Sequence, residues 1–202
     1  EIKHLKPLPK RKLAAVKKYP DIRVRPSSTI RINKYVYSVH SRLIGEKVTA
    51  LLYSNRIKIK YGGQTVDILP RISGKQTAHI DYRHLIDSLI RKPGAFKNYR
   101  YQKHLFPNTH FRLAYDLLQE ELPERCDKEY LKILHTAAYE SEAKVTKALA
   151  KIIDSNLPLS VELVKQYIAK DASLLKIEDI PVASLELSDY DKLLHSGEVT
   201  NE

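Results

Sequence analysis

The sequence contains a single cysteine, Cys126, and neither methionine nor tryptophan among its 202 residues. One cysteine cannot form an internal disulfide, which excludes a disulfide-stapled secreted scaffold and favours a reducing cytoplasm. No window approaches the ~20 apolar residues of a membrane helix, and no charged and then apolar leader opens the chain. We therefore expect a soluble protein without a membrane partner. Because the sequence starts with Glu1 and lacks methionine, we also expect it to be a fragment of a longer protein.

Patterns typical of catalysis are scarce as well. The sequence has no Walker-type glycine-rich loop and no nucleophile elbow, and its few early acidic residues lack the context of a two-metal site. His79, Asp81 and His84 are close enough in sequence to suggest a metal site, but further ligands are missing at characteristic spacing. Asp81 is better explained as a helix N-cap. We expect no catalytic residue, no metal and no cofactor in this chain.

Positive charge, in contrast, is abundant and unevenly placed. Residues 1–110 contain 24 Lys and Arg against 6 Asp and Glu, whereas residues 111–202 contain 11 against 18. The resulting net charge of +18 in the first part exceeds what solubility requires. The asymmetry favours a polyanion as partner of the first part and a protein as partner of the second. The alternative is that basic and acidic faces only keep the fold soluble.

The pattern along the chain predicts an α+β protein with four segments. Residues 1–28 are basic and interrupted by prolines, which predicts an extended linker. Residues 29–71 alternate in β-prone runs separated by short turns, which predicts a small, partly open β-barrel. Its strands are expected at 29–32, 35–39, 47–53, 56–61 and 64–69. In the fourth run we expect Ile57, Ile59 and Tyr61 to face the core, and Arg56, Lys58 and Lys60 to face the other side.

Helical periodicity takes over in residues 72–170 and predicts a helical bundle. Asp81 is expected to cap the first helix, which ends at Pro93-Gly94. Further helices are expected at 109–121, 127–139, 141–155 and 160–170, each opened by a Ser, Thr or Asp cap. Residues 171–202 alternate acids with isolated apolar residues, which predicts an acidic, extended tail.

The segment 91–103 mixes cations with aromatic residues, a combination suited to a nucleic-acid surface. The alternative is that Phe96, Tyr99 and Phe106 pack in the core, and we expect this to hold for most of the aromatics but not for the cations. Cations in the linker and the strands would extend the same basic surface. The predicted DNA-binding residues are Lys10, Arg11, Lys12, Lys17, Lys18, Arg23, Arg25, Arg31, Lys58, Lys60, Arg91, Lys92, Lys97, Arg100 and Lys103.

Several stretches carry a family resemblance: RINKYVYSVHSRLIGEKV at 31–48, DYRHLIDSLIRKPGAFKNYRY at 81–101, LFPNTHFRLAYDLL at 105–118 and EYLKILHTAA at 129–138. They closely resemble the carboxy-terminal part of IstA-type transposases of bacterial insertion sequences, which look related to phage Mu and Tn7-type transposases. LKPLP at 5–9 and DYDKLL at 189–194 extend the resemblance to nearly the whole chain. One departure is His40, where the family often has proline.

The resemblance implies a longer DDE transposase whose Mg-dependent Asp-Asp-Glu domain lies outside residues 1–202. It implies that the small barrel grips double-stranded transposon-end or target DNA, and that the helical end assists assembly with other transposase subunits and meets an AAA+ helper ATPase resembling IstB. The protein would act in the bacterial cytoplasm at the nucleoid. The rival hypotheses are a protein-interaction scaffold with little direct DNA binding and, more distantly, an RNA-associated basic protein. The residues expected to bind the helper are Leu185, Leu187, Tyr190, Leu193 and Leu194.

Overall fold

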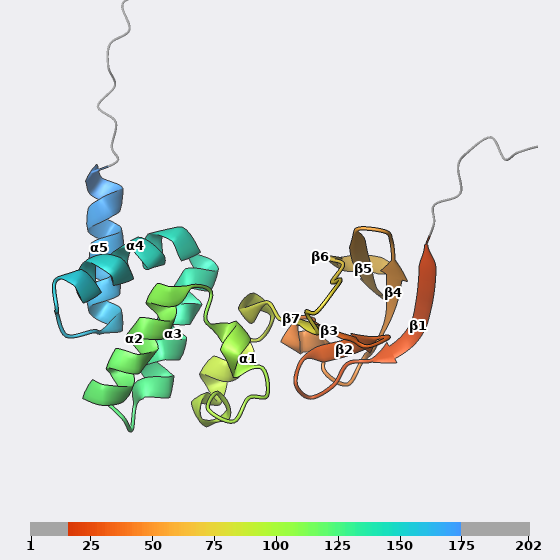
Figure 1. Cartoon of the computed structure of the whole chain (residues 1–202), viewed down its shortest axis with the longest axis horizontal. Helices are drawn as coiled ribbons and strands as arrows, with labels where there is room; N and C mark the ends of the chain where they lie inside the picture. Colours follow the sequence, from red (N-terminus) through yellow and green to blue (C-terminus); the bar gives the residue numbers. More distant parts are fainter. Residues whose placement is uncertain (1–15, 175–202) are drawn as a thin grey trace, which may run out of the picture. The chain divides into compact units, whose positions relative to one another are not determined.

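The computed structural model describes residues 16–174 (Figure 1). Strands occupy the first part of this range and helices the second, which confirms the predicted α+β class. Of these residues, those up to Ile168 belong to one compact unit and those from Ala169 onward to a second.

The strands form two separate sheets. The four-stranded sheet has the antiparallel order β1 (Lys17–Arg23), β4 (Lys47–Leu52), β5 (Arg56–Tyr61) and β6 (Gln64–Pro70). The three-stranded sheet has β3 (Tyr35–Ser38) at its centre, antiparallel to β2 (Thr29–Ile32) and parallel to the short β7 (Ala78–His79). The ladders of the described strands do not join into a closed barrel, so the barrel part of the expectation is not confirmed.

The alternation of side chains explains why the two sheets pack on one core. Ile57 and Ile59 of β5 are fully buried, as their spacing predicts. Ile30 and Ile32 of β2 enter the same core from the other sheet. Its complete set is Val24, Ile30, Ile32, Tyr37, Val39, Val48, Ala50, Ile57, Ile59, Leu69 and Ile72. Burial of this apolar surface is the main force that holds the two sheets together.

Two expectations for the strand region were wrong. Residues 17–23 are not linker but β1, an edge strand paired with β4. Pro20 is compatible with this strand because it lies where the register shifts between Tyr19 and Ile22, and Asp21 there has a φ of 53°. Tyr61 does not face the core either: it is 40% exposed and its hydroxyl donates to Glu46 Oε2 at 3.0 Å.

The helical part confirms the expected number and approximate bounds of the helices. They are α1 (Ile86–Arg91), α2 (Thr109–Glu121), α3 (Cys126–Tyr139), α4 (Glu142–Asp154) and α5 (Val161–Leu174). Asp81 caps a preceding 3-10 turn, Tyr82–His84, rather than α1 itself. Ser141 caps α4 as predicted, whereas Asn108 rather than Thr109 caps α2 and no side chain caps α3. Two further 3-10 turns, Pro93–Ala95 and Gln102–Leu105, connect α1 to α2.

An aromatic cluster fixes the segment between α1 and α2. Phe96 is fully buried, and its ring centroid lies 5.4 Å from that of Tyr115 and 5.3 Å from that of Tyr130. The Tyr130 hydroxyl donates to the carbonyl of Leu105 at 2.9 Å. Burial raises the pKa of Tyr130 well above its usual value, which keeps this donor protonated. The exposed residues between Phe96 and Leu105 are therefore held at both ends by the helical core.

Candidate nucleic-acid interface

Cations cover the outward side of the four-stranded sheet. Because side chains alternate, the residues between the buried Ile57 and Ile59 of β5 face away from the core. Lys58 lies opposite Leu51 of β4, and Leu51 lies opposite Lys18 of β1. A shallow cavity of about 360 Å³ on this side is lined by Lys18, Lys47 and Lys60. We call this surface the outer basic face; its cations are Lys18, Arg23, Lys47, Arg56, Lys58 and Lys60.

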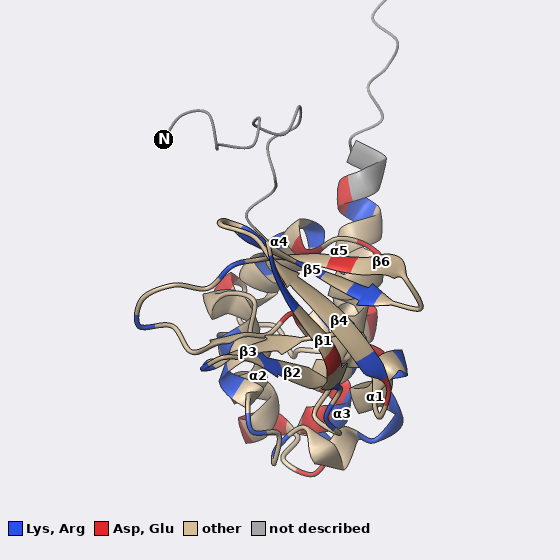
Figure 2. Ribbon diagram, turned by 90° about the vertical axis from the view of Figure 1, so that its right-hand side faces the viewer, with Lys and Arg blue, Asp and Glu red and all other residues tan. Residues whose placement is uncertain are grey.

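Three acidic residues lie on or beside these strands, Asp21, Glu46 and Asp67, and none forms a salt bridge with a cation of the outer basic face within the described residues. Asp67 of β6 lies on the core side, where its Oδ2 is 3.0 Å from His84 Nε2. Glu46 accepts the hydroxyl of Tyr61. Within residues 16–174, none of the six cations forms a salt bridge. Figure 2 looks onto this sheet and shows blue Lys and Arg positions on its strands.

The segment 91–103 separates its aromatics from its cations, as expected. Phe96 is buried, and the Tyr99 hydroxyl donates to the carbonyl of Ser27 at 2.9 Å. Burial raises the pKa of Tyr99, so this donor also stays protonated. The cations of the segment are all exposed: Arg91, Lys92, Lys97, Arg100 and Lys103. The aromatics therefore anchor the segment, and the cations remain available to a ligand.

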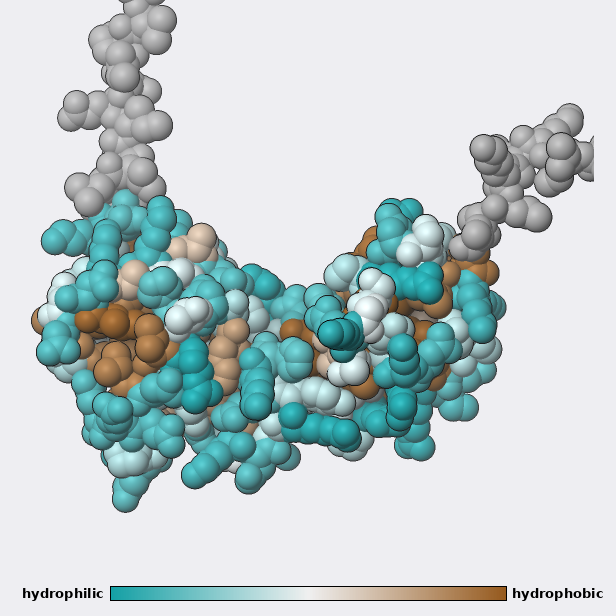
Figure 3. Space-filling model, viewed as in Figure 1, coloured by the Kyte–Doolittle hydropathy of each residue, from teal (hydrophilic) through white to brown (hydrophobic). Residues whose placement is uncertain are grey.

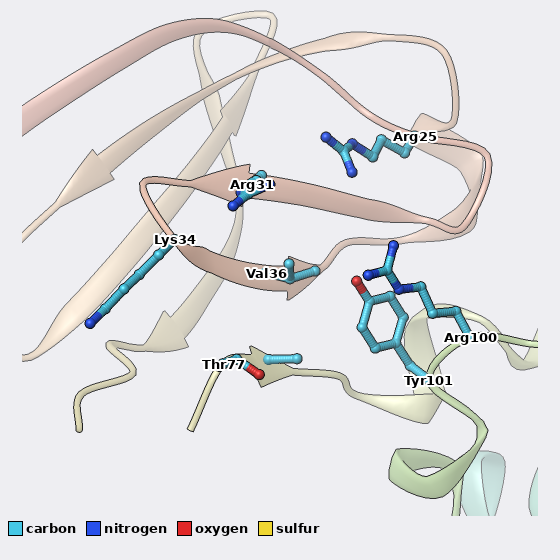
Figure 4. A pocket seen from close by; sticks show the side chains of 8 residues that line it. Arg25, Arg31, Lys34, Val36, Thr77, Arg100 and Tyr101 are labelled. Carbon is cyan, nitrogen blue, oxygen red and sulfur yellow. The ribbon is translucent and has the colours of Figure 1, made fainter. Parts of the chain in front are cut away.

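A second cationic site lies on the other side of the strand region, where Arg100 meets the three-stranded sheet. A pocket of about 190 Å³ is lined by Arg25, Arg31, Lys34 and Arg100, together with Tyr101 (Figure 4). Val36, Thr77 and Ala78 complete its lining. Arg31, Val36 and Ala78 occupy one cross-strand row on the side of β2, β3 and β7 that faces away from the strand core, where Ala78 is buried against the helical core. We call this site the basic pocket.

The structure thus divides the predicted DNA-binding residues into groups. Four of them contribute to the outer basic face, three to the basic pocket, and five others lie on exposed positions elsewhere, namely Lys17, Arg91, Lys92, Lys97 and Lys103. Lys10, Arg11 and Lys12 lie outside the described residues, as do the predicted helper-binding residues from Leu185 to Leu194. Lys34 and Lys47 were missed, and Arg56 was expected on the cationic side of its strand but was not included among the DNA-binding residues. The alternation of Arg56 with Lys58 and Lys60 already indicated that Arg56 belongs to the same surface.

The His79, Asp81 and His84 cluster has a structural explanation. Asp81 Oδ1 accepts the backbone N–H of Arg83 at 2.9 Å and so caps the turn Tyr82–His84. His84 lies between Ser38 Oγ, 2.9 Å from its Nδ1, and the Asp67 carboxylate. Among the residues that the structure describes, no group of three or more His, Cys, Asp or Glu side chains is placed to hold a metal ion. Across the same residues, no helix has the length and apolar character of a membrane span.

Two comparisons show which known proteins this chain is similar to. Residues 8–81 match the family described as Mu transposase, C-terminal domain, and this range contains the seven strands found in residues 16–174. The chain is also 31% identical over 204 residues to uncharacterized protein y4jA/y4nE/y4sE of Sinorhizobium fredii (strain NBRC 101917 / NGR234). That match covers 96% of this chain and 39% of the relative, so the chain spans well under half of the relative's length. No solved structure matches the chain. The family match supports a transposase C-terminal region.

Proposed function

We propose that this chain is the non-catalytic, DNA-binding and assembly region of a DDE transposase. The observation that carries the proposal is the outer basic face, which lies within the residues that match the Mu transposase C-terminal domain. Six cations there have no ion-pair partner among the described residues. A match to a C-terminal domain is consistent with a chain that is not the catalytic part.

The spacing of the outer basic face suits a DNA backbone. Alternate residues of a strand are about 6.6 Å apart and neighbouring strands about 4.8 Å apart. Lys58 and Lys60 are alternate residues of β5, and Lys47 lies on the neighbouring β4. Double-stranded DNA carries one negative charge per ~1.7 Å of its axis, so several of these cations can each approach a phosphate. Such contacts hold and orient DNA without reading its sequence.

Finer parts of the proposal come from the resemblance to IstA-type transposases. The DNA would be a transposon end or the target, and the partners would be other transposase subunits and an AAA+ helper ATPase resembling IstB. The tail residues Leu185, Leu187, Tyr190, Leu193 and Leu194 would bind the helper. The Mg-dependent Asp-Asp-Glu chemistry would belong to the rest of the transposase.

Charge reversal on the outer basic face tests DNA binding. We expect Lys58→Glu with Lys60→Glu to weaken binding to duplexes of any sequence, measured by fluorescence anisotropy with labelled DNA. A matched control is Lys128→Glu with Lys165→Glu, which changes the charge equally at exposed positions of α3 and α5. If both double variants weaken binding to the same extent, the outer basic face is not the DNA-binding surface. Circular dichroism confirms that each variant is folded.

A second candidate is a protein-interaction scaffold, favoured by the acidic end of the chain. Residues 175–202 contain 7 Asp and Glu against 2 Lys and Arg. Several large apolar side chains of the helical part are exposed, and Figure 3 shows apolar surface over the helices at the left of the view. The exposed apolar side chains of the helical part are Leu113, Leu122, Tyr139 and Leu157. Deletion of residues 172–202 separates the two roles: lost helper binding with intact DNA binding assigns recruitment to the tail.

A further inference from the structure

The basic pocket unites parts of the chain that are far apart in sequence. Arg25 precedes β2, Arg31 lies on β2, and Lys34 lies in the turn to β3. Arg100 and Tyr101 come from the segment that the aromatic cluster holds beside this sheet. In Figure 4 the Arg100 guanidinium lies next to the Tyr101 hydroxyl, whereas the Arg25 guanidinium lies across β2 from Val36 and the Lys34 side chain extends away from both. None of the eight lining residues is acidic.

Hydrogen-bond donors in the basic pocket remain unused. Arg31 donates its Nε to the carbonyl of Asn33 at 3.1 Å, which leaves its two terminal nitrogens. The Arg100 guanidinium lies 5.7 Å from the centre of the Tyr101 ring, an arrangement that leaves its N–H groups accessible. Within residues 16–174, no carboxylate pairs with any of the four cations. Like charges around one cavity repel each other, so an anion that enters it is stabilised.

Size and donor geometry narrow the class of anion. A volume of about 190 Å³ equals the share of roughly six water molecules in liquid water, so the pocket has room for a phosphate group but not for a base pair. Guanidinium groups bind phosphate oxygens through two parallel hydrogen bonds, and three of the four cations are arginines. The Tyr101 hydroxyl adds a neutral donor.

We propose that the basic pocket is a phosphate-binding site that takes one phosphate group of DNA. This inference rests on the proposed function and deepens it, because it assigns a fixed contact point in addition to the open outer basic face. Arg100 lies beyond the matched residues 8–81, whereas Arg31 lies within them. A bound phosphate therefore ties the helical segment to the strand region and fixes the position of both on the DNA.

Binding of inorganic phosphate tests the pocket without DNA. The Nε–Hε signals of Arg31 and Arg100 are followed by NMR while phosphate replaces chloride at constant ionic strength. We expect both signals to shift with saturation, while the signal of Arg56 on the outer basic face stays in place. Shifts of equal size at Arg56 would show general screening by the anion and would overturn the proposal.

DNA binding supplies the second test. We expect Arg31→Gln with Arg100→Gln to weaken duplex binding about 10- to 100-fold and to reduce the salt slope by about one. The matched control, Lys128→Gln with Lys165→Gln, is expected to change the affinity less than about threefold. An equal loss of DNA affinity in both double variants would overturn the proposal that the basic pocket binds phosphate. If the wild-type chain binds no duplex, the proposed function fails, and the phosphate titration alone then decides on the pocket.

Duplexes with a 5′-hydroxyl or a 5′-phosphate identify the source of the phosphate. If the 5′-phosphate strengthens wild-type binding but not that of the Arg31 and Arg100 double variant, the pocket takes a terminal phosphate. If both duplexes bind wild type equally and the variant weakly, the pocket takes a phosphodiester within the strand. Both outcomes support the phosphate site.

Discussion

Replacing Ser38 by alanine removes the centre of a hydrogen-bond network that joins β3 to the turn Tyr82–His84. Ser38 Oγ accepts the backbone N–H of Asp81 at 2.8 Å and lies 2.9 Å from His84 Nδ1. Because the hydroxyl accepts from Asp81, its own hydrogen is free to be donated to Nδ1. His84 Nε2 lies 3.0 Å from Asp67 Oδ2. The hydrogen bonds of Ser38 thus link β3 to the turn Tyr82–His84, and His84 also lies beside Asp67 of β6.

The expected loss of stability follows from the groups left without partners. In Ser38→Ala, the Asp81 N–H and His84 Nδ1 lose their partner, and each unsatisfied buried group costs about 1–3 kcal/mol. We expect the free energy of unfolding to fall by about 3 kcal/mol in total, because both residues are half-buried. With an m value of about 2 kcal/mol/M, the urea midpoint falls by about 1.5 M.

Urea denaturation followed by circular dichroism measures this difference. The exposed Ser54 provides the control, and we expect Ser54→Ala to change stability by less than about 0.5 kcal/mol. A Ser38→Ala midpoint within the range of the control would refute the network. An altered m value would instead show that the variant changes the extent of cooperative unfolding.

Three further predictions concern the segment between α1 and α2 and the buried tyrosines. Phe96→Ala is expected to reduce stability by about 3–5 kcal/mol, measured by denaturation, because the ring is fully buried among three aromatic neighbours. Tyr99→Phe removes the hydrogen bond to Ser27 and should reduce the free energy of unfolding by about 1 kcal/mol. An unchanged free energy of unfolding would mean that water replaces this hydrogen bond. Burial raises the pKa of Tyr99 and Tyr130, so the unfolded state loses these protons first and stability should fall as the pH rises above about 10. Tyrosinate absorbance that develops before unfolding would contradict this.

Strands marked by alternating apolar residues and by glycine turns were predictable from the sequence. The alternation around Ile57 and Ile59, and the two glycines after Tyr61, determined β5, its buried side and its turn. β1 escaped prediction because Pro20 in a basic run resembles a linker. Whether such a run forms a strand depends on pairing with β4, about 30 residues later in the sequence.

The candidate sites were predictable only where their residues are close together in the sequence. The charge excess and the exposure of the cations in segment 91–103 follow from composition and from the packing demand of Phe96. Arg100 lines the same pocket as Arg25 and Arg31 because of tertiary contacts, such as the hydrogen bond from Tyr99 to Ser27. A local sequence pattern does not predict such contacts. Lys34 was missed because it occupies a turn, where an isolated lysine is usually only solvated.

The salt dependence of duplex binding tests the central claim most directly. If the six cations of the outer basic face each neutralise one phosphate, the logarithm of the affinity falls with the logarithm of salt at a slope near −5. The account predicts that the apparent Kd of the chain for duplex DNA rises about a thousandfold between ~50 and ~200 mM salt. A Kd that changes less than about threefold over this range would contradict it.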